Sequence, residues 1–168
     1  MKKSYLYPIM AVVLGILLDQ YTKLLAVKHL MDAPIPIIDG VFELHYLENR
    51  GAAFGIMQNQ QTFFLIAGVV ILGLATWAFI KLPEIKRLIP IRICIVLICA
   101  GAIGNMIDRV RLNYVIDFLY FKLINFPIFN VADIYVTLAA FGLVLLILFY
   151  YSDEEIDSLY QKIGWKKK

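Results

Sequence analysis

Long apolar stretches recur along the chain, and four of them approach or exceed the length needed to cross a membrane. A spanning helix needs about 20 mostly apolar residues, because an α-helix rises only about 1.5 Å per residue across the hydrocarbon layer. The stretches cover about residues 5–27, 62–80, 91–107 and 132–151. The third is short between Arg92 and Asp108, so we expect its end to lie shallow in the bilayer.

The first stretch could be a cleavable signal peptide, because a basic start precedes an apolar run. Asp19 and Lys23 interrupt that run, however, and no small-residue cleavage site follows it. We therefore expect a helix that is retained in the protein.

The segments between the apolar stretches carry strand signals. Residues 41–46 alternate roughly between apolar and polar side chains, as a half-buried strand does, and residues 114–121 are rich in β-branched and aromatic residues. Pro34, Pro36 and Gly40 add turn signals to the first connection. The pattern predicts an all-α membrane protein with four transmembrane helices and a small extracytoplasmic β-sheet. We expect one domain over residues 1–168, with outer-face loops at 28–61 and 108–131.

Composition supports a bilayer as the solvent. Hydrophobic residues make up 61% of the chain and charged residues 17%, whereas a soluble domain is about 45–50% apolar and about 25% charged. No tract dense in lysine and arginine is interleaved with aromatics, so nothing indicates a nucleic-acid partner. Cys94 and Cys99 lie in one apolar run and are interpreted as small packing residues.

Basic residues gather at the two chain ends and in the second connection. Of the 16 lysines and arginines, those in these regions are Lys2, Lys3, Lys81, Lys86, Arg87, Arg92, Lys162, Lys166, Lys167 and Lys168. The first connection is acidic instead, with Asp32, Asp39, Glu43 and Glu48. Because lysine and arginine concentrate in cytoplasmic loops, we predict that both termini are cytoplasmic and that the first and third connections face outward.

Charged and amide side chains form five clusters near the predicted outer ends of the helices. A charged side chain at the bilayer centre costs about 2.5–3.5 kcal/mol on insertion scales, so each cluster requires a compensating role. The clusters are Asp19–Lys23, Asn49–Gly55, Gly101–Arg109, Val115–Phe118 and Phe129–Asp133.

The first two clusters have plain structural explanations beside functional ones. Asp19 and Lys23 stand four residues apart on one helix face, where they can neutralise each other. The functional alternative is that Asp19 faces a substrate cavity. Asn49 and the small residues after it suit a turn with tight packing, although the amide of Asn49 also offers both a donor and an acceptor.

The third cluster can be a polar helix end. Gly101 and Gly104 permit close helix contact, and Asn105 and Arg109 share one helix face. Asp108 and Arg109 would then anchor the helix at the membrane interface.

The last two clusters each contain an aspartate in an apolar context. Asp133 opens the fourth helix just after Asn130, so helix capping is a sufficient role for it. Asp117 lies inside an apolar, strand-like run with no local residue that neutralises it. If the two carboxylates meet, they cannot both stay ionised in a low-dielectric site and would share one proton. One could then activate a water while the other donates a hydrogen bond to a scissile carbonyl, as in aspartic proteases. Spacing alone does not show that they meet, and it leaves Asp108 open as a partner.

The five clusters together resemble the type II (lipoprotein) signal peptidase family of aspartic peptidases. The family pattern is D-Q-x-T-K, N-x-G-A-A-F-G, G-N-x-x-D-R, V-V-D-F and F-N-x-A-D, in this order. The matching segments are Asp19–Lys23, Asn49–Gly55, Gly104–Arg109, Val115–Phe118 and Phe129–Asp133. The chain departs from the usual residues at Ala100, Ile116 and Ile134, which affects packing more than chemistry.

The resemblance implies roles for particular residues. Asp117 and Asp133 would be the catalytic pair. The residues expected to bind substrate, by lining or bracing the site, are Asp19, Lys23, Asn49, Gly51, Asn105, Arg109 and Asn130. We expect no metal and no cofactor, because the chain has two histidines and neither an HExxH nor a CxxC motif.

The resemblance also implies a substrate and a place in the cell. The substrate would be a prolipoprotein whose cysteine already carries diacylglycerol, cleaved just before that cysteine in a bacterial cell membrane, with membrane lipid as the other partner. We expect a monomer, because one chain supplies every motif, and inhibition by peptide antibiotics of the kind that act on this family.

Two other classes of function also fit polar residues inside a membrane. A small proton-coupled carrier would use them as an ion pathway, although four spans are few and no repeated half is visible. A non-enzymatic assembly factor would use them to join helices. A cleavage assay separates the three, because only a peptidase shortens a lipid-modified precursor.

Overall fold

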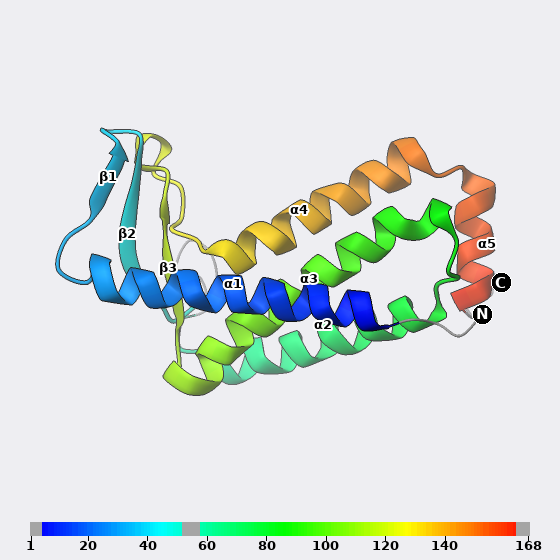
Figure 1. Cartoon of the computed structure of the whole chain (residues 1–168), viewed down its shortest axis with the longest axis horizontal. Coiled ribbons are helices and arrows are strands. Elements are labelled where there is room, and N and C mark those ends of the chain that lie inside the picture. Colours follow the sequence, from blue (N-terminus) through cyan, green and yellow to red (C-terminus); the bar gives the residue numbers. More distant parts are fainter. Residues whose placement is uncertain (1–4, 52–57, 164–168) are drawn as a thin grey trace.

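Four long helices run alongside one another in the computed structural model, which describes residues 5–51 and 58–163 (Figure 1). They are α1 (Leu6–Leu30), α2 (Gln61–Lys81), α3 (Ile89–Leu112) and α4 (Val131–Leu145), which a π-helical turn, Leu146–Tyr150, continues. All four spans are long and apolar enough to cross a membrane, which confirms the predicted fold class.

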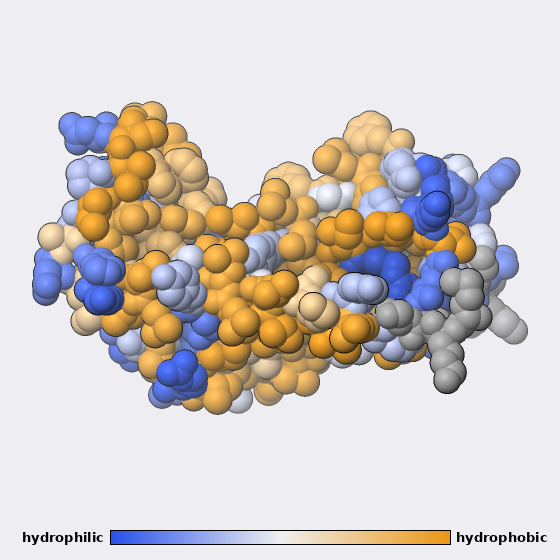
Figure 2. Space-filling model, in the orientation of Figure 1, coloured by the Kyte–Doolittle hydropathy of each residue, from blue (hydrophilic) through white to orange (hydrophobic). Residues whose placement is uncertain are grey.

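These apolar segments form helices because a bilayer offers no hydrogen-bond partners, so the backbone groups of each segment must pair with one another. The residues of α2 illustrate the environment: only 6% of its most apolar window is fully buried inside the protein, so much of its surface is left for lipid. Figure 2 shows the result, with apolar residues over the helices and most polar residues at the two ends.

Helix α3 is longer than the sequence predicted. A 3₁₀ turn, Lys86–Leu88, leads into it, and Pro90 sits in its first turn. The helix continues to Leu112 and is followed by Asn113, which adopts a left-handed conformation with φ 65°. Asp108 and Arg109 therefore belong to the helix and not to the loop expected at 108–131. Charged residues ended the apolar pattern without ending the helix.

A three-stranded antiparallel sheet lies beside one end of the bundle, which we call the sheet end. Its strands are β1 (Ile35–Ile38), β2 (Phe42–Asn49) and β3 (Val115–Tyr120), in that order. The turn between β1 and β2 contains Gly40 with φ 70°, a conformation that favours glycine. The register sets Leu47 opposite Asp117 and Asn49 opposite Val115, which brings the motif residue Asn49 close to the lone aspartate of β3.

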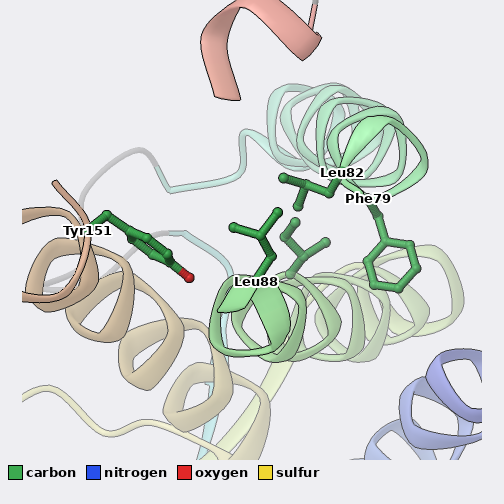
Figure 3. Close-up of a cluster of buried hydrophobic side chains, with 5 residues drawn as sticks. Phe79, Leu82, Leu88 and Tyr151 are labelled. Atoms are coloured by element: carbon green, nitrogen blue, oxygen red, sulfur yellow. The ribbon is translucent and has the colours of Figure 1, made fainter. Parts of the chain in front are cut away.

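The opposite end of the bundle, which we call the far end, holds the start of α1 and a short helix, α5 (Asp153–Ile163) (Figure 1). The sequence analysis did not predict α5. Figure 3 shows the apolar cluster at this end, made by Phe79, Leu82, Leu88, Ile95 and Tyr151. A second cluster lies where α1 meets β3 and contains Ala26, Leu30, Ile116 and Phe118.

Candidate active site

A cavity of about 620 Å³ opens between α2, α3 and α4 at the sheet end. Most of its wall is apolar, with residues such as Phe64, Ile98 and Val136. Besides Thr137 of α4, the polar and charged side chains of the described wall come from four elements: Asn49 of β2, Asn105 and Arg109 of α3, Asp117 of β3 and Asp133 of α4. The cavity therefore joins a hydrophobic groove to one polar region with two carboxylates.

Asp117 is almost completely buried, with 1% of its surface exposed. Its position in β3 directs it to two amide donors: Asn49 Nδ2 donates to Oδ2 at 2.8 Å, and Asn130 Nδ2 donates to Oδ1 at 2.6 Å. Burial, and next the charge of Asp133, raise the pKa of Asp117 from its ordinary value of 3.8 to about 7. Asp117 is therefore partly protonated near neutral pH, where an ordinary aspartate is ionised.

Asp133 stands in the first turn of α4 and takes part in a reciprocal helix cap. The Asn130 side chain accepts from the Asp133 backbone N–H at 3.0 Å, and Asp133 Oδ2 accepts from the Asn130 N–H at 3.1 Å. Asp133 Oδ1 accepts from Asn105 Nδ2 at 2.8 Å. The capping role considered in the sequence analysis is therefore real, and the same carboxylate also lines the cavity.

Two amides connect the carboxylates. Asn130 Nδ2 lies 2.6 Å from Asp117 Oδ1 and 3.1 Å from Asn105 Oδ1, while the amide nitrogen of Asn105 binds Asp133. Asp117 and Asp133 thus face one cavity and are joined through a short chain of hydrogen bonds. Asn130 itself is fully buried. It is not among the described residues that line the cavity, so it supports the two carboxylates from behind the cavity wall.

Arg109, Asn49 and Gly51 also lie on the cavity wall. The guanidinium of Arg109 sits 4.8 Å from the centre of the Phe64 ring, and the Asn49 side chain accepts from the Gly51 N–H at 2.9 Å. The rest of that motif, Ala52–Gly55, lies outside the described residues.

Asp19 and Lys23 do not face the cavity, so the functional alternative weighed for Asp19 is corrected. Their exposed fractions are 0% and 1%, and neither belongs to the described cavity lining. They form the ion pair that the spacing predicted, at 2.9 Å, and Lys23 makes a second ion pair with Asp108. Contact with substrate is therefore not available to these two residues in this conformation.

The roles predicted for Asp108 are also corrected. The sequence analysis allowed an interfacial anchor or a partner in the carboxylate pair, but Asp108 is 3% exposed and is absent from the described cavity lining. It contacts Lys23 and Gln20 instead. No local pattern signals this burial, because the partner lysine comes from a different helix.

Sequence reasoning missed the apolar part of the site. Phe64, Gly68 and Met106 line the cavity, and a Cβ added at Gly68 would meet the Met106 sulfur at 2.6 Å. The glycine thus makes room for the methionine. Apolar residues of one helix look alike in sequence, so nothing separates those that face a cavity from those that face lipid. Within the described residues, no group of three histidine, cysteine or acidic side chains could hold a metal ion.

The chain is similar in sequence to proteins of known activity. A family model described as "Signal peptidase (SPase) II" matches residues 11–149. A lipoprotein signal peptidase of Caldanaerobacter subterraneus subsp. tengcongensis is 46% identical over 143 residues, covering 84% of this chain and 95% of its own. One of Clostridium tetani is 44% identical over 160 residues, covering 89% and 99%.

Two solved structures described as bacterial membrane enzymes also resemble the chain. The first, determined at 2.3 Å, has a TM-score of 0.76 and 31% identity and covers 88% of this chain and 92% of its own. The second, determined at 1.9 Å, has a TM-score of 0.74 and 30% identity, with 90% and 99% coverage.

Proposed function

The chain belongs to the signal peptidase II family, and from that premise we propose that Asp117 and Asp133 carry out its peptidase reaction as an aspartic pair. The protein is a multi-pass membrane peptidase that removes signal peptides from prolipoproteins. One observation supports the aspartic chemistry above the others: both carboxylates line one cavity and are linked through the amides of Asn130 and Asn105.

The pair divides the work between an acid and a base. With its pKa raised to about 7, Asp117 is protonated in part of the molecules at neutral pH, and the protonated form donates a hydrogen bond to the scissile carbonyl. Asp133 accepts a proton from a water, which attacks the carbonyl carbon. The peptide C–N bond then breaks as the leaving amine takes up the proton that Asp133 accepted from the water. Donors from Asn49, Asn105 and Asn130 hold the carboxylates in position throughout.

The substrate is a prolipoprotein that already carries diacylglycerol on its cysteine, and cleavage falls just before that cysteine. The apolar part of the cavity, between helices that face lipid, can receive a hydrophobic signal sequence while the acyl chains stay in the bilayer. Arg109 and Gly51, beside the carboxylates, offer positions to bind the peptide backbone.

In this proposal the protein works in a bacterial cell membrane with both termini in the cytoplasm and the sheet end outside. The lysine and arginine bias of the sequence supports this orientation. A reporter that is active only outside the cytoplasm should be silent when fused after Lys168 and active when inserted near Asp39. The reverse pattern would reject the orientation.

The proposed enzyme is a monomer that peptide antibiotics inhibit. One chain supplies all five polar motifs and the described polar groups of the cavity wall, which supports a monomer. A peptide that occupies the cavity would exclude the substrate from both carboxylates.

The test is cleavage of a lipid-modified precursor by purified Asp117→Asn and Asp133→Asn variants. Asparagine is nearly isosteric with aspartate, so folding should persist, but it cannot serve as the base. A positioned general base contributes about 10²–10⁴-fold, and we expect losses of that size. Asp32→Asn, at an exposed position after α1, is the matched control and should keep full activity. An Asp117→Asn variant that retains more than about a tenth of the rate would reject the pair.

A further inference from the structure

A buried ion triplet lies behind the wall that carries the two cavity aspartates. Lys23 Nζ stands 2.9 Å from Asp19 Oδ2 and 2.8 Å from Asp108 Oδ2. The three side chains are 0–3% exposed. Taking three charges out of water is costly, and a buried ion pair is weak grounds for stability alone. Their arrangement therefore needs a different explanation.

Each carboxylate of the triplet holds the backbone just before one catalytic aspartate. Asp19 Oδ1 accepts from the N–H of Ala132, the residue preceding Asp133, at 2.9 Å. Asp108 Oδ2 accepts from the N–H of Ile116, the residue preceding Asp117, at 3.2 Å. The triplet thus contacts α4 and β3 at equivalent points, one residue before each catalytic side chain.

Lys23 connects these two contacts, because it forms ion pairs with both Asp19 and Asp108. Gln20 Nε2 forms a second bridge, with 3.2 Å to Asp19 Oδ2 and 2.9 Å to Asp108 Oδ1. The helices approach closely enough because Gly104 has no side chain: a Cβ there would lie 2.6 Å from Asp19 Oδ2. If either bridge were lost, the two backbone contacts could move apart.

Lys23 also fixes the orientation of an amide that touches the catalytic pair. Its Nζ donates to Asn105 Oδ1 at 2.9 Å. An ammonium group only donates, so Asn105 must turn its oxygen toward Lys23 and its nitrogen toward Asp133, which it reaches at 2.8 Å. With the amide reversed, its oxygen would face the carboxylate of Asp133.

We propose that Lys23 is a positioning residue for the peptidase reaction, which sets the separation of Asp117 and Asp133 through Asp108 and Asp19. This inference rests on the proposed function of the two aspartates. A residue that does not touch substrate can still have a large effect on the rate, because displacing a catalytic group by about 1 Å can cost about 10²-fold.

The test uses Lys23→Met and the double variant Lys23→Met/Asp108→Asn in the precursor-cleavage assay. The double variant removes one positive and one negative charge, so the net charge near Asp117 and Asp133 does not change. The ion pair between positions 23 and 108 is lost. An asparagine at 108 can still accept from the Ile116 N–H. The double variant also avoids leaving a carboxylate at position 108 without its lysine, which helps folding. Lys122→Met, which removes an ion-paired lysine outside the cavity lining, is the matched control.

We expect kcat per folded molecule to fall about 10²-fold in both Lys23 variants, with KM nearly unchanged and Lys122→Met normal. A raised KM with normal kcat would mean that Lys23 binds substrate, and would overturn the proposal. So would normal kcat in the folded double variant, because charge alone would then explain the single one. Asp117→Asn is assayed in parallel: if it is active, the dyad fails, whereas an inactive Asp117→Asn beside normal Lys23 variants rejects only the positioning role.

Discussion

The two ends of the helix bundle differ in the charged side chains that they bury. At the far end, Phe79, Leu82 and Leu88 pack in an apolar cluster, and the ion pair of Arg87 with Glu155 stays exposed. The sheet end also contains a buried apolar cluster, with Ala26 and Ile116, but it buries charged residues as well. Asp117 lines the cavity there, and Asp19 is buried away from the cavity lining. Burying apolar groups stabilises a fold, whereas burying charges costs free energy unless each charge is paired.

The difference indicates how the two ends divide stability and chemistry. The far end includes residues beyond the part that the family model matches, which ends at residue 149, such as Tyr151 and helix α5. The sheet end contains all the residues proposed for catalysis. If this division is correct, substitutions at the far end should change stability with little effect on kcat, and those at the sheet end should do the opposite.

After the two aspartates themselves, the largest effect is expected from Asn130→Ala at the sheet end. The substitution removes one of the two amide donors to Asp117 and the cap of α4 together. Loss of one preorganised donor typically costs about 10²–10³ in kcat, and loss of an N-cap costs about 1 kcal/mol of stability. Single-turnover cleavage and a thermal melt measure the two effects. A variant with normal kcat would show that the amide chain is not needed for chemistry.

The pH dependence should also reside at the sheet end. Above about pH 7, Asp117 loses the proton that its raised pKa retains, so we expect kcat to decline. Because the folded-state pKa lies above the ordinary value, the stability that neutral Asp117 contributes is lost as pH rises through about 7. Rates and melting temperatures between about pH 5 and about pH 8 test both statements. A rate that rises throughout this range would contradict the assignment of Asp117 as the acid.

Leu88→Ala probes the far end, where we expect a loss of stability without a loss of chemistry. Leu88 is 2% exposed in the apolar cluster, and truncating such a leucine typically costs about 2–5 kcal/mol. Leu123→Ala, at a position 70% exposed, is the matched control and should melt normally. A fall in kcat per folded Leu88→Ala molecule would show that the two ends are coupled.

The smallest effect is expected from chelation. Two carboxylates and a water suffice for the proposed reaction, so cleavage in detergent should survive thorough removal of divalent ions. Loss of activity with rescue by one specific ion would make the aspartates metal ligands.

Local patterns were enough to predict the elements that depend on local physics. The four helices follow from apolar length, and the strands near residues 41–46 and 114–121 follow from alternation and β-branched content. The end of α3 was missed because Asp108 looks like a terminus until its partner on α1 is known. Helix α5 was missed because its apolar residues, such as Ile156, follow the last spanning stretch in a polar segment.

The site was predictable in membership and less so in geometry. The aspartates and asparagines stand out because polar residues are rare in apolar helices. Which of them faces the cavity depends on how the helices pack. Asp133 lines the cavity, whereas Asp19 is absent from the described lining and accepts a hydrogen bond from the backbone of Ala132. No spacing rule along one chain distinguishes these two positions.

The central claim is that Asp117 and Asp133 act as one unit, and a double-variant comparison tests it most directly. Cleavage rates of Asp117→Asn, Asp133→Asn and the variant with both substitutions would be measured on one lipid-modified precursor. Residues that act as a unit have strongly non-additive effects, so the double variant should lose about as much activity as either single variant. If the two losses multiply instead, or if either single variant retains more than about a tenth of the wild-type rate, the carboxylates do not form one catalytic pair.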